Sequence, residues 1–254
     1  MNNSVVNWIE VNSPDPEATF SFYSGVFGWD QSEANMGEMG MYTMFHESGN
    51  PTPFAGIMKM TSPEWDGIPP HWMTYFHTSD IAATCKAVGD NGGKVCYEPF
   101  DVPGTGTFSM CTDPHGANFS IHQPGENPGS GPSPVTWYEL YSPNPEEAKA
   151  FYSSIFPWTA QDYDMGDFMY PMFYLGDRMF AGIMNTSTPE MESIPPNWLI
   201  YFYTADIAAT VEKVTANGGS IVNGTMEVPG VGQIAIVADN HGATFAVHQP
   251  VPQE

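Results

Sequence analysis

Short motifs from the first half of this sequence return in the same order in its second half, and this duplication constrains the fold more than any other feature. The run Phe-Ala-Gly-Ile-Met at residues 54–58 recurs unchanged at 180–184, and the run Asp-Ile-Ala-Ala-Thr at 80–84 recurs at 206–210. Trp8 corresponds to Trp137, an offset of 129, whereas the later motifs are offset by 126. The second copy is therefore three residues shorter, and we expect this deletion in the loop after Trp158.

The duplication predicts two tandem domains, at residues 1–124 and 135–254. Between the copies, residues 125–134 are rich in Pro, Gly and Ser. This composition is typical of an extended linker.

Two helices are predicted in each copy. The run Asp-Pro-Glu at 15–17 supplies a capping residue, a Pro for the first turn and an acid near the positive end of a helix, and Asn-Pro-Glu at 144–146 does the same. A second helix is expected to begin near Asp80 and to stop at Asn91-Gly92, with the same signals at Asp206 and Asn217-Gly218.

Short β-type segments surround these helices, so we expect an α+β fold with the order β-α-β-β-β twice in each copy. The expected strands of the first copy are residues 5–11, 41–45, 54–59, 72–78, 94–95, 108–111 and 117–122.

The charge balance excludes several kinds of partner. Six Lys and Arg against 29 Asp and Glu give a formal charge of −23. The sequence therefore lacks the cluster of basic residues expected of a nucleic-acid binder, and its negative charge argues against docking on anionic lipid. No run of apolar residues approaches the roughly 20 that a membrane helix needs, and the N-terminal residues do not resemble a secretion signal. The three cysteines all lie in the first copy without a CxxC pair, so we expect reduced thiols and a cytoplasmic location.

In its motifs and in their order along the chain, the sequence resembles the vicinal oxygen chelate superfamily, which includes glyoxalases, bleomycin-resistance proteins and extradiol dioxygenases. The resemblance rests on Ser-Pro-Asp-Pro-Glu-Ala at 13–18 leading to Phe22-Tyr23, on Pro-Pro-x-Trp-x-x-Tyr-Phe at 69–76, and on Asp-Pro-His-Gly-Ala at 113–117, all of which recur with few changes. It is closest to a glyoxalase-related branch with two tandem domains. It implies paired βαβββ units whose mixed sheets curl into a cup that holds the ligand.

Enzymes of this superfamily hold a divalent metal in the cup with His or Glu side chains. By alignment, the first-strand ligand position falls on Trp8 and Trp137, the fifth-strand position on Thr74 and Ile200, and the last-strand position on Ser120 and Ala246. The fourth falls within 54–58 and 180–184, which offer no carboxylate or imidazole. These side chains are poor metal ligands, so we expect neither a metal site nor another cofactor.

One Glu and one His in each copy are the candidate catalytic residues. Because strand side chains return to the same face every two residues, Glu10 lies beside the Trp8 position and His122 beside the Ser120 position, and Glu139 and His248 are their counterparts. Such a pair could act as acid and base or anchor a polar ligand. The alternative is that these groups are hydrogen-bonded structural residues at strand ends.

Aromatic and polar side chains on the same strands are the candidate ligand-binding residues, since a small-molecule site is typically an apolar wall with a few polar groups. The alternative is ordinary packing between curled sheets. We expect a more polar pocket in the first copy than in the second, and exposed turn positions for His115 and His241. The candidate ligand-binding residues are Trp8, Trp72, Thr74, Phe76, Asn118 and Ser120 in the first copy, with Trp137, Trp198, Ile200 and Phe202 in the second.

Three functional hypotheses remain open. The first is metal-independent binding or sequestration of a small molecule in the cups. The second is a lyase, isomerase or dioxygenase that uses a relocated metal site or a Glu/His acid–base pair. The third is a scaffold for protein interactions. The chain is expected to be a monomer whose tandem domains mimic a dimer, or a homodimer.

Overall fold

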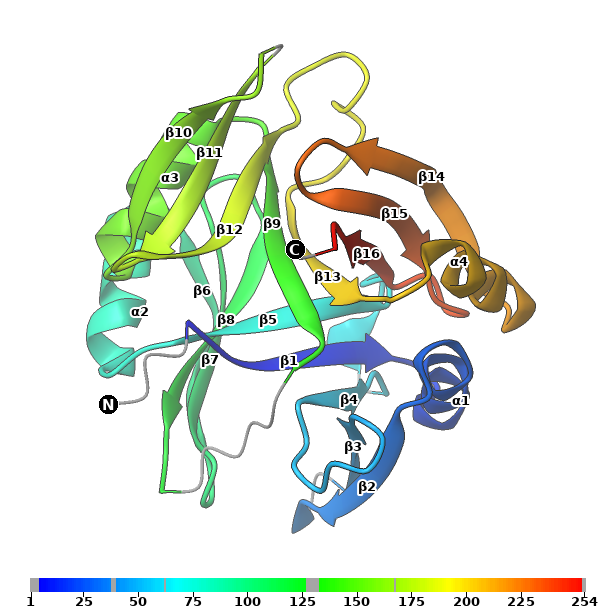
Figure 1. The fold of residues 1–254 in the computed structure, drawn as a ribbon. Coiled ribbons are helices and arrows are strands. Elements are labelled where there is room, and N and C mark those ends of the chain that lie inside the picture. The colour runs from blue at the N-terminus through cyan, green and yellow to red at the C-terminus, as the bar shows by residue number, and fades with distance from the viewer. Residues whose placement is uncertain (1–4, 38–39, 62, 127–132, 167, 253–254) are drawn as a thin grey trace. The chain divides into compact units, whose positions relative to one another are not determined.

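A computed structural model of the chain describes residues 5–37, 40–61, 63–126, 133–166 and 168–252. Most of the predicted linker, residues 127–132, lies outside the described residues. Within them, each copy contains two helices and eight strands, and the first copy also has a short 3-10 turn at Pro63–Trp65 (Figure 1). No helix in the described part of the chain is long and apolar enough to cross a membrane.

The two copies have the same order of elements. The first contains β1 (Val6–Ser13), α1 (Pro16–Phe27), β2 (Asp30–Asn35), β3 (Met41–His46), β4 (Ala55–Lys59), β5 (His71–His77), α2 (Ile81–Asp90), β6 (Lys94–Val102), β7 (Gly106–Thr112) and β8 (Asn118–Pro124). The second contains β9 (Val135–Ser142), α3 (Pro145–Ile155), β10 (Thr159–Asp164), β11 (Met169–Leu175), β12 (Arg178–Asn185), β13 (Asn197–Tyr203), α4 (Ile207–Ala216), β14 (Ser220–Val228), β15 (Gly232–Ala238) and β16 (Thr244–Pro250).

Each copy supplies one mixed sheet of eight strands, which confirms the predicted α+β class and the paired βαβββ units. The first sheet has the order β2-β3-β4-β1-β5-β8-β7-β6, and the second repeats it as β10-β11-β12-β9-β13-β16-β15-β14. Within each βαβββ unit the first and last strands pair in parallel, β1 with β4 and β5 with β8. The other neighbouring strands of a βαβββ unit are antiparallel. Neither sheet closes into a barrel, since β2 and β6, or β10 and β14, remain at opposite ends.

All four predicted helices form, and local capping explains their boundaries. Asp15 accepts a hydrogen bond from the Ala18 backbone N–H at 3.1 Å, and Asn144 caps α3 in the same way. α1 ends at Gly28, whose φ of 75° is the left-handed conformation that favours glycine. Asp80 caps α2 and Asp206 caps α4, again through the backbone N–H three residues on.

The strands differ from the prediction in two respects. β2 was not expected, because its sequence Asp-Gln-Ser-Glu-Ala-Asn is polar and its residues are exposed or only partly buried, so the apolar alternation that signals a strand is absent. The segment predicted at 94–95 is the start of β6, which continues to Val102 with irregular pairing to β7.

The sequence suggested that the three missing residues of the second copy are lost from one loop after Trp158. The structure shows instead that they are lost at two places. β2 and β10 begin at Asp30 and Thr159, an offset of 129, whereas β3 and β11 begin at Met41 and Met169, an offset of 128. Gly56 and Gly182 then occupy equivalent positions at an offset of 126. One residue is therefore lost between β2 and β3 and two between β3 and β4.

The chain divides into two compact units, and each unit takes elements from both copies. Unit 1 comprises Met1–Asn7, Thr74–Pro128 and Trp137–Leu199, and unit 2 comprises Trp8–Met73, Gly129–Thr136 and Ile200–Glu254. Each predicted domain, by contrast, follows a single copy, and those boundaries remain a prediction.

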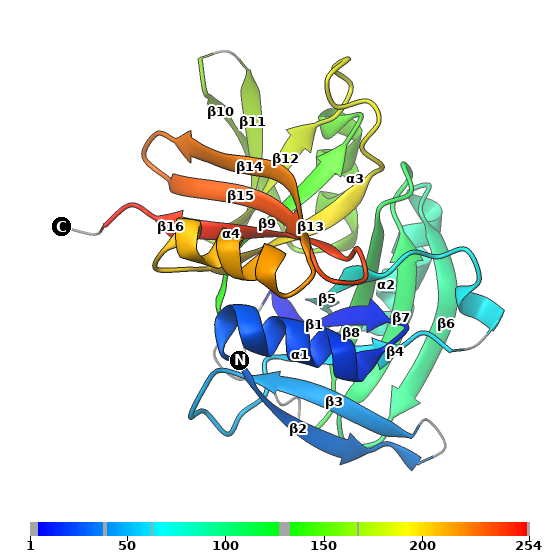
Figure 2. The same ribbon diagram turned by 90° about the vertical axis from the view of Figure 1, so that its right-hand side faces the viewer.

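Helices of different copies pack against each other within each unit. In unit 2, α1 and α4 lie side by side in both views (Figures 1 and 2), and in unit 1, α2 contacts α3. The core of unit 1 brings Phe76 and Phe119 of the first copy against Phe156 and Trp158 of the second. This packing joins the first half of one copy to the second half of the other.

Candidate functional site

A buried carboxylate, a tyrosine and a tryptophan form one hydrogen-bonded cluster in each copy. In unit 2, Trp8 Nε1 donates to the Tyr42 hydroxyl at 3.0 Å, and this hydroxyl donates to Glu10 Oε2 at 2.5 Å. Glu10 is only 3% exposed, while Trp8 and Tyr42 are partly exposed. We call this set the Glu10 cluster.

Unit 1 contains the equivalent Glu139 cluster. Trp137 Nε1 donates to the Tyr170 hydroxyl at 3.1 Å, and the hydroxyl donates to Glu139 Oε1 at 2.6 Å. Burial, and then the nearby Glu139 carboxylate, raise the pKa of Tyr170 far above its usual value, so the phenol stays protonated and acts as the donor.

Both clusters depend on a glycine of the repeated Phe-Ala-Gly-Ile-Met motif. Gly56 pairs with Glu10 across the parallel strands β1 and β4, and a Cβ at Gly56 would lie 1.9 Å from the Tyr42 hydroxyl oxygen. Gly182 pairs with Glu139, and a Cβ there would lie 1.9 Å from the Tyr170 hydroxyl oxygen. The ring can reach the carboxylate only because residue 56 or 182 has no side chain.

A second pair of clusters links helices to the Asp-x-His-Gly-Ala turns. In unit 2, Trp72 Nε1 donates to the Tyr23 hydroxyl at 2.7 Å, and this hydroxyl donates to Asp239 Oδ2 at 3.2 Å. In unit 1, Trp198 donates to Tyr152 at 2.9 Å, and Tyr152 donates to Asp113 at 3.3 Å. In each case the tyrosine and the aspartate come from different copies.

Burial dominates the chemistry of these second clusters. It raises the pKa of Asp113 and Asp239, although backbone N–H groups of the turn oppose this by bonding to each carboxylate. Tyr23 and Tyr152 also have raised pKa values, from burial and from the adjacent carboxylates. These groups are fully enclosed and join secondary-structure elements, so the arrangement is structural.

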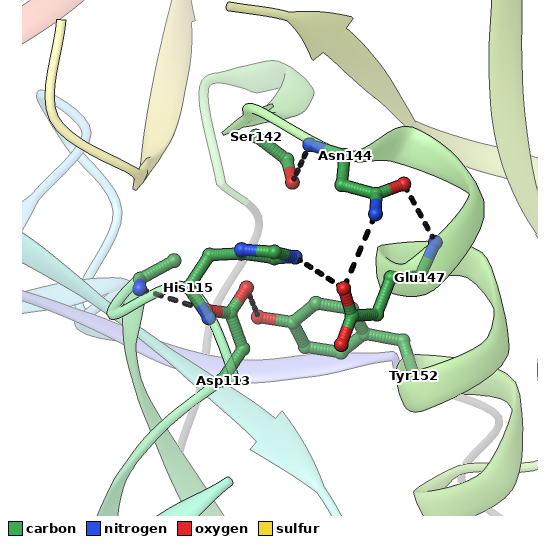
Figure 3. A network of polar contacts seen from close by, with 7 residues as sticks. Asp113, His115, Ser142, Asn144, Glu147 and Tyr152 are labelled. Carbon is green, nitrogen blue, oxygen red and sulfur yellow. Dashed lines mark hydrogen bonds and ion pairs between the residues drawn. The ribbon is translucent and has the colours of Figure 1, made fainter. Parts of the chain in front are cut away.

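The prediction that His115 and His241 are exposed turn residues is wrong, because both are partly buried. Figure 3 shows His115 beside Glu147 of α3, with His115 Nε2 3.1 Å from Glu147 Oε2, a contact that lacks hydrogen-bond geometry but forms an ion pair when the imidazole is protonated. In unit 2 the residue that matches Glu147 is Ala18, and Asn240 donates to its backbone carbonyl at 3.1 Å instead.

His122 and His248, the candidate catalytic histidines, have different partners. His122 Nε2 lies 3.1 Å from the Thr105 carbonyl, its ring stacks on Phe108, and its Nδ1 is buried without a hydrogen-bond partner among the described residues. Burial lowers the pKa of His122, so its imidazole is neutral at pH 7. His248 bonds through Nδ1 to Thr136 Oγ1 at 3.0 Å and through Nε2 to the Val231 carbonyl at 3.2 Å.

The candidate Glu and His residues of one copy belong to different compact units. Glu10 and His248 lie in unit 2, and Glu139 and His122 lie in unit 1. The acid–base pairing of Glu10 with His122, and of Glu139 with His248, therefore remains a prediction.

Most of the candidate ligand-binding aromatics are enclosed by other rings. Trp72 and Phe202 contact each other in unit 2, with centroids 5.1 Å apart, and Phe76 and Trp198 contact each other in unit 1 at 4.9 Å. Ile200 is fully buried and Asn118 is exposed. Trp8 and Trp137 are the candidate tryptophans that keep partial exposure.

Two of the three polar candidates of the first copy, Thr74 and Ser120, lie on opposite faces of the sheet. Tyr75 pairs with Ser120 across β5 and β8, so Thr74, one residue before Tyr75, points the other way. The hydroxyls of Thr74 and Ser120 are both buried and have no hydrogen-bond partner among the described residues. The roles of these residues in ligand binding remain predictions.

The side chains at the metal-ligand positions that the resemblance implies do not suit a divalent ion. Indole, aliphatic and neutral hydroxyl groups occupy them, and no group of three or more His, Cys, Asp or Glu in the described part of the chain is placed to share an ion.

A separate open hollow of about 390 Å³ lies on unit 2 around the 3-10 turn. Its lining is rich in proline and mixes polar and apolar surface. It is lined by Pro14, Met60, Thr61, Pro63, Trp65, Asp66, Ile68 and Pro70.

The sequence profile of the Glyoxalase/Bleomycin resistance protein/Dioxygenase superfamily matches residues 5–121 and 135–247. The chain belongs to this superfamily. The Mycobacterium bovis protein named "Putative glyoxylase CFP32" is 31% identical over 254 residues, covering 98% of this chain and 95% of that protein. The Streptomyces peucetius protein named "Anthracycline biosynthesis protein DnrV" is 30% identical over 253 residues, covering 94% and 91%.

Solved structures of superfamily proteins share the fold. The Mn(II)-bound glyoxalase from Novosphingobium aromaticivorans matches with a TM-score of 0.62 at 15% identity, covering 96% of this chain and 81% of that one. The 2,3-dioxygenase LapB from Pseudomonas sp. KL28 matches with a TM-score of 0.61 at 14% identity, covering 96% and 92%. At this level of identity the likeness establishes the superfamily fold alone.

The tyrosines at the centre of all four clusters are not among the candidate residues predicted from the sequence. Tyr42 follows Met41 and Tyr170 follows Met169, so the paired methionines marked equivalent positions in a region where the repeat is otherwise weak. Tyr23 was noted only within the Phe22-Tyr23 motif, and Tyr152 is its counterpart in the second copy. No motif links these tyrosines to carboxylates far along the chain.

Proposed function

We propose that this superfamily member binds a small aromatic molecule without a metal ion and acts by sequestering or sensing it. The observation that carries the proposal is the repeated cluster in which a partly exposed tryptophan is tied, through one tyrosine hydroxyl, to a buried glutamate. Trp8 and Trp137 are the rings that would contact the ligand.

The cluster combines the two features that small-molecule sites require. A flat indole gives a large apolar surface on which a planar ligand can stack, and its Nε1–H bond to tyrosine fixes the edge of that ring. The glutamate provides a polar group in a low-dielectric setting, where its interactions with a ligand are stronger than in water. Because Tyr42 and Tyr170 already donate to the carboxylates, these groups are held in place before a ligand arrives.

One relative favours an aromatic ligand. The Streptomyces peucetius protein is named for anthracycline biosynthesis, and anthracyclines are fused-ring molecules with flat faces. An anthracycline is therefore the first probe to test.

The experiment is a calorimetric titration of the full chain with an anthracycline, after dialysis against a chelator. We expect saturable binding without metal, weakened at least fivefold by Trp8→Leu or Trp137→Leu. Tyr97→Leu, which removes an exposed aromatic ring on β6 outside both clusters, is the control and should leave the affinity unchanged. Binding that appears only after Mn²⁺ or Zn²⁺ is added, or that responds to Tyr97→Leu alone, would contradict the proposal.

An acid–base enzyme is the second candidate, favoured by His122. Its neutral imidazole keeps a buried Nδ1 lone pair that no described residue engages, and a free lone pair is the chemical requirement for a general base. The relative named as a glyoxylase suggests the assay, in which the chain is incubated with methylglyoxal and glutathione. Metal-independent turnover that His122→Gln abolishes would favour the enzyme over the binder.

A further inference from the structure

Asn12 holds a buried hydrogen-bond acceptor that nothing in the described residues satisfies. Its side chain is 1% exposed, its Nδ2 lies 3.3 Å from His71 Nε2, and its Oδ1 has no partner. Asn12 lies two residues after Glu10 on β1, so both side chains point to the same face of the strand, with Cβ atoms about 7 Å apart.

The neighbouring histidine fixes which end of the amide is left unpaired. His71 Nδ1 lies 2.8 Å from the Pro69 carbonyl, which can only accept, so Nδ1 carries a hydrogen. Burial lowers the pKa of His71, so its imidazole is neutral at pH 7 and Nε2 presents a lone pair. Only the amide nitrogen of Asn12 can donate to that lone pair, and its oxygen is therefore the group without a partner.

The fold itself does not require an amide at this position. The second copy has Tyr141 in place of Asn12 and Asn197 in place of His71, and the same strands form there. Because a buried acceptor without a hydrogen bond destabilises the folded state, its presence in one copy alone points to a role other than folding.

The Glu10 carboxylate and Asn12 Oδ1 favour one class of ligand. Both are acceptors, and the nearby Nε1–H of Trp8 already donates to Tyr42. A carboxylate or carbonyl on a ligand would meet acceptor oxygens there, whereas a hydroxyl or an ammonium would supply the hydrogen that Asn12 Oδ1 lacks among the described residues. The indole face and the net charge of −23 both favour a cation further.

We propose that Asn12, Glu10 and Trp8 form a subsite in the first copy that recognises a hydrogen-bond donor, preferably an ammonium group, attached to an aromatic ligand. The proposal rests on the binding function proposed above and specifies its selectivity. Asn12 is the specificity-determining residue, and Tyr141 leaves the second copy without this preference.

Three probes that share one ring system test the subsite in the full chain at pH 7. They are 2-(2-naphthyl)ethylamine, 2-(2-naphthyl)ethanol and 2-ethylnaphthalene, which carry a cationic donor, a neutral donor and no donor. We expect the amine to bind at least tenfold more tightly than the hydrocarbon, with the alcohol between them. Asn12→Leu should reduce the amine-to-hydrocarbon ratio below threefold and leave the affinity for 2-ethylnaphthalene unchanged.

Two further variants complete the test. Asn223→Leu alters an exposed position on β14 and should leave all three affinities unchanged. Asn12→Asp keeps an acceptor and should retain the tenfold preference for the amine, so it decides the question if Asn12→Leu does not fold. A fall of the ratio to near one in Asn12→Asp would overturn the subsite.

The outcomes separate the two proposals. Equal affinity of the wild-type chain for all three probes, or a ratio that survives Asn12→Leu, would overturn the subsite and leave aromatic binding standing. Failure of every probe to bind would contradict the proposed function and the subsite with it.

Discussion

The hydroxyl oxygen of Tyr42 lies 1.9 Å from the place that a Cβ atom at Gly56 would occupy. The ring crosses over β4 at this point and reaches Glu10 on the neighbouring strand. The glycine is thus a requirement of the Glu10 cluster, and the repeated Phe-Ala-Gly-Ile-Met motif has a physical explanation.

Gly56→Ala should destabilise the protein and displace Tyr42 from Glu10. The added methyl group would overlap both the hydroxyl oxygen and the ring carbon that carries it, which lies 2.4 Å from the Cβ position, so the whole ring must move. We expect a loss of about 1–3 kcal/mol in the free energy of unfolding, measured by chemical denaturation. Gly182→Ala should cause a similar loss of stability by displacing Tyr170 from Glu139.

The matched control is Gly89→Ala in α2, where no atom lies within 4 Å of the added Cβ. Alanine favours helix over glycine, so stability should stay the same or rise by up to about 1 kcal/mol. Equal effects of the two substitutions would show that the Tyr42 contact does not constrain residue 56.

The repeat, the caps and the apolar alternation were enough to predict the helices, most strands and the superfamily fold, because each is a local signal or is copied intact. Asp15 and Asp80 mark helix starts whatever surrounds them. β2 escaped prediction because it is a polar edge strand held by its pairing with β3 rather than by burial.

The candidate site was only partly predictable. Strand periodicity placed Glu10 beside Trp8, but the bond that joins them passes through Tyr42, some 30 residues away, and only tertiary structure brings it there. Asn12 gave no sequence signal, because its unpaired oxygen depends on the tautomer of His71. The packing of the first half of one copy against the second half of the other, with Tyr23 donating to Asp239, likewise cannot be predicted from motifs.

Ser120→Ala should raise the free energy of unfolding by about 1 kcal/mol. The Ser120 hydroxyl is fully buried without a hydrogen-bond partner in the described structure, and the second copy already has Ala246 at this position. Ser109→Ala is the control, because this equally buried hydroxyl donates to the Tyr97 carbonyl at 2.7 Å. It should lower stability by about 1–2 kcal/mol. A loss of stability in Ser120→Ala would mean that the hydroxyl has a bound partner in solution.

Thiol reactivity should rank the three cysteines by burial. Cys96 is exposed, Cys85 is partly buried, and burial raises the pKa of Cys111 to about 12. With an aromatic disulfide reagent at pH 8, we expect Cys96 to react first and Cys111 only after denaturation. Cys96→Ser should remove the fast phase and leave the others. Rapid labelling of Cys111 in the native protein would contradict its burial.

Asp113→Asn should flatten the dependence of stability on pH. Burial places the folded-state pKa of Asp113 above the ordinary value of 3.8, so the folded protein binds a proton more tightly than the unfolded chain does. The contribution of this carboxyl to stability is therefore greatest below pH 3.8 and falls as pH rises through the raised folded-state value. The amide has no such proton, while its oxygen can still accept from the His115 and Ala117 backbone N–H groups.

The measurement is the free energy of unfolding of wild type minus that of Asp113→Asn, taken from pH 3.5 to 7. We expect this difference to become less favourable to the wild type as pH rises. Asp239→Asn, in the matching cluster of unit 2, should give the same slope, because burial raises the pKa of Asp239 in the same way. A difference that grows with pH would show that the bonds from Tyr152 and the turn N–H groups outweigh burial, and that Asp113 is held as a carboxylate.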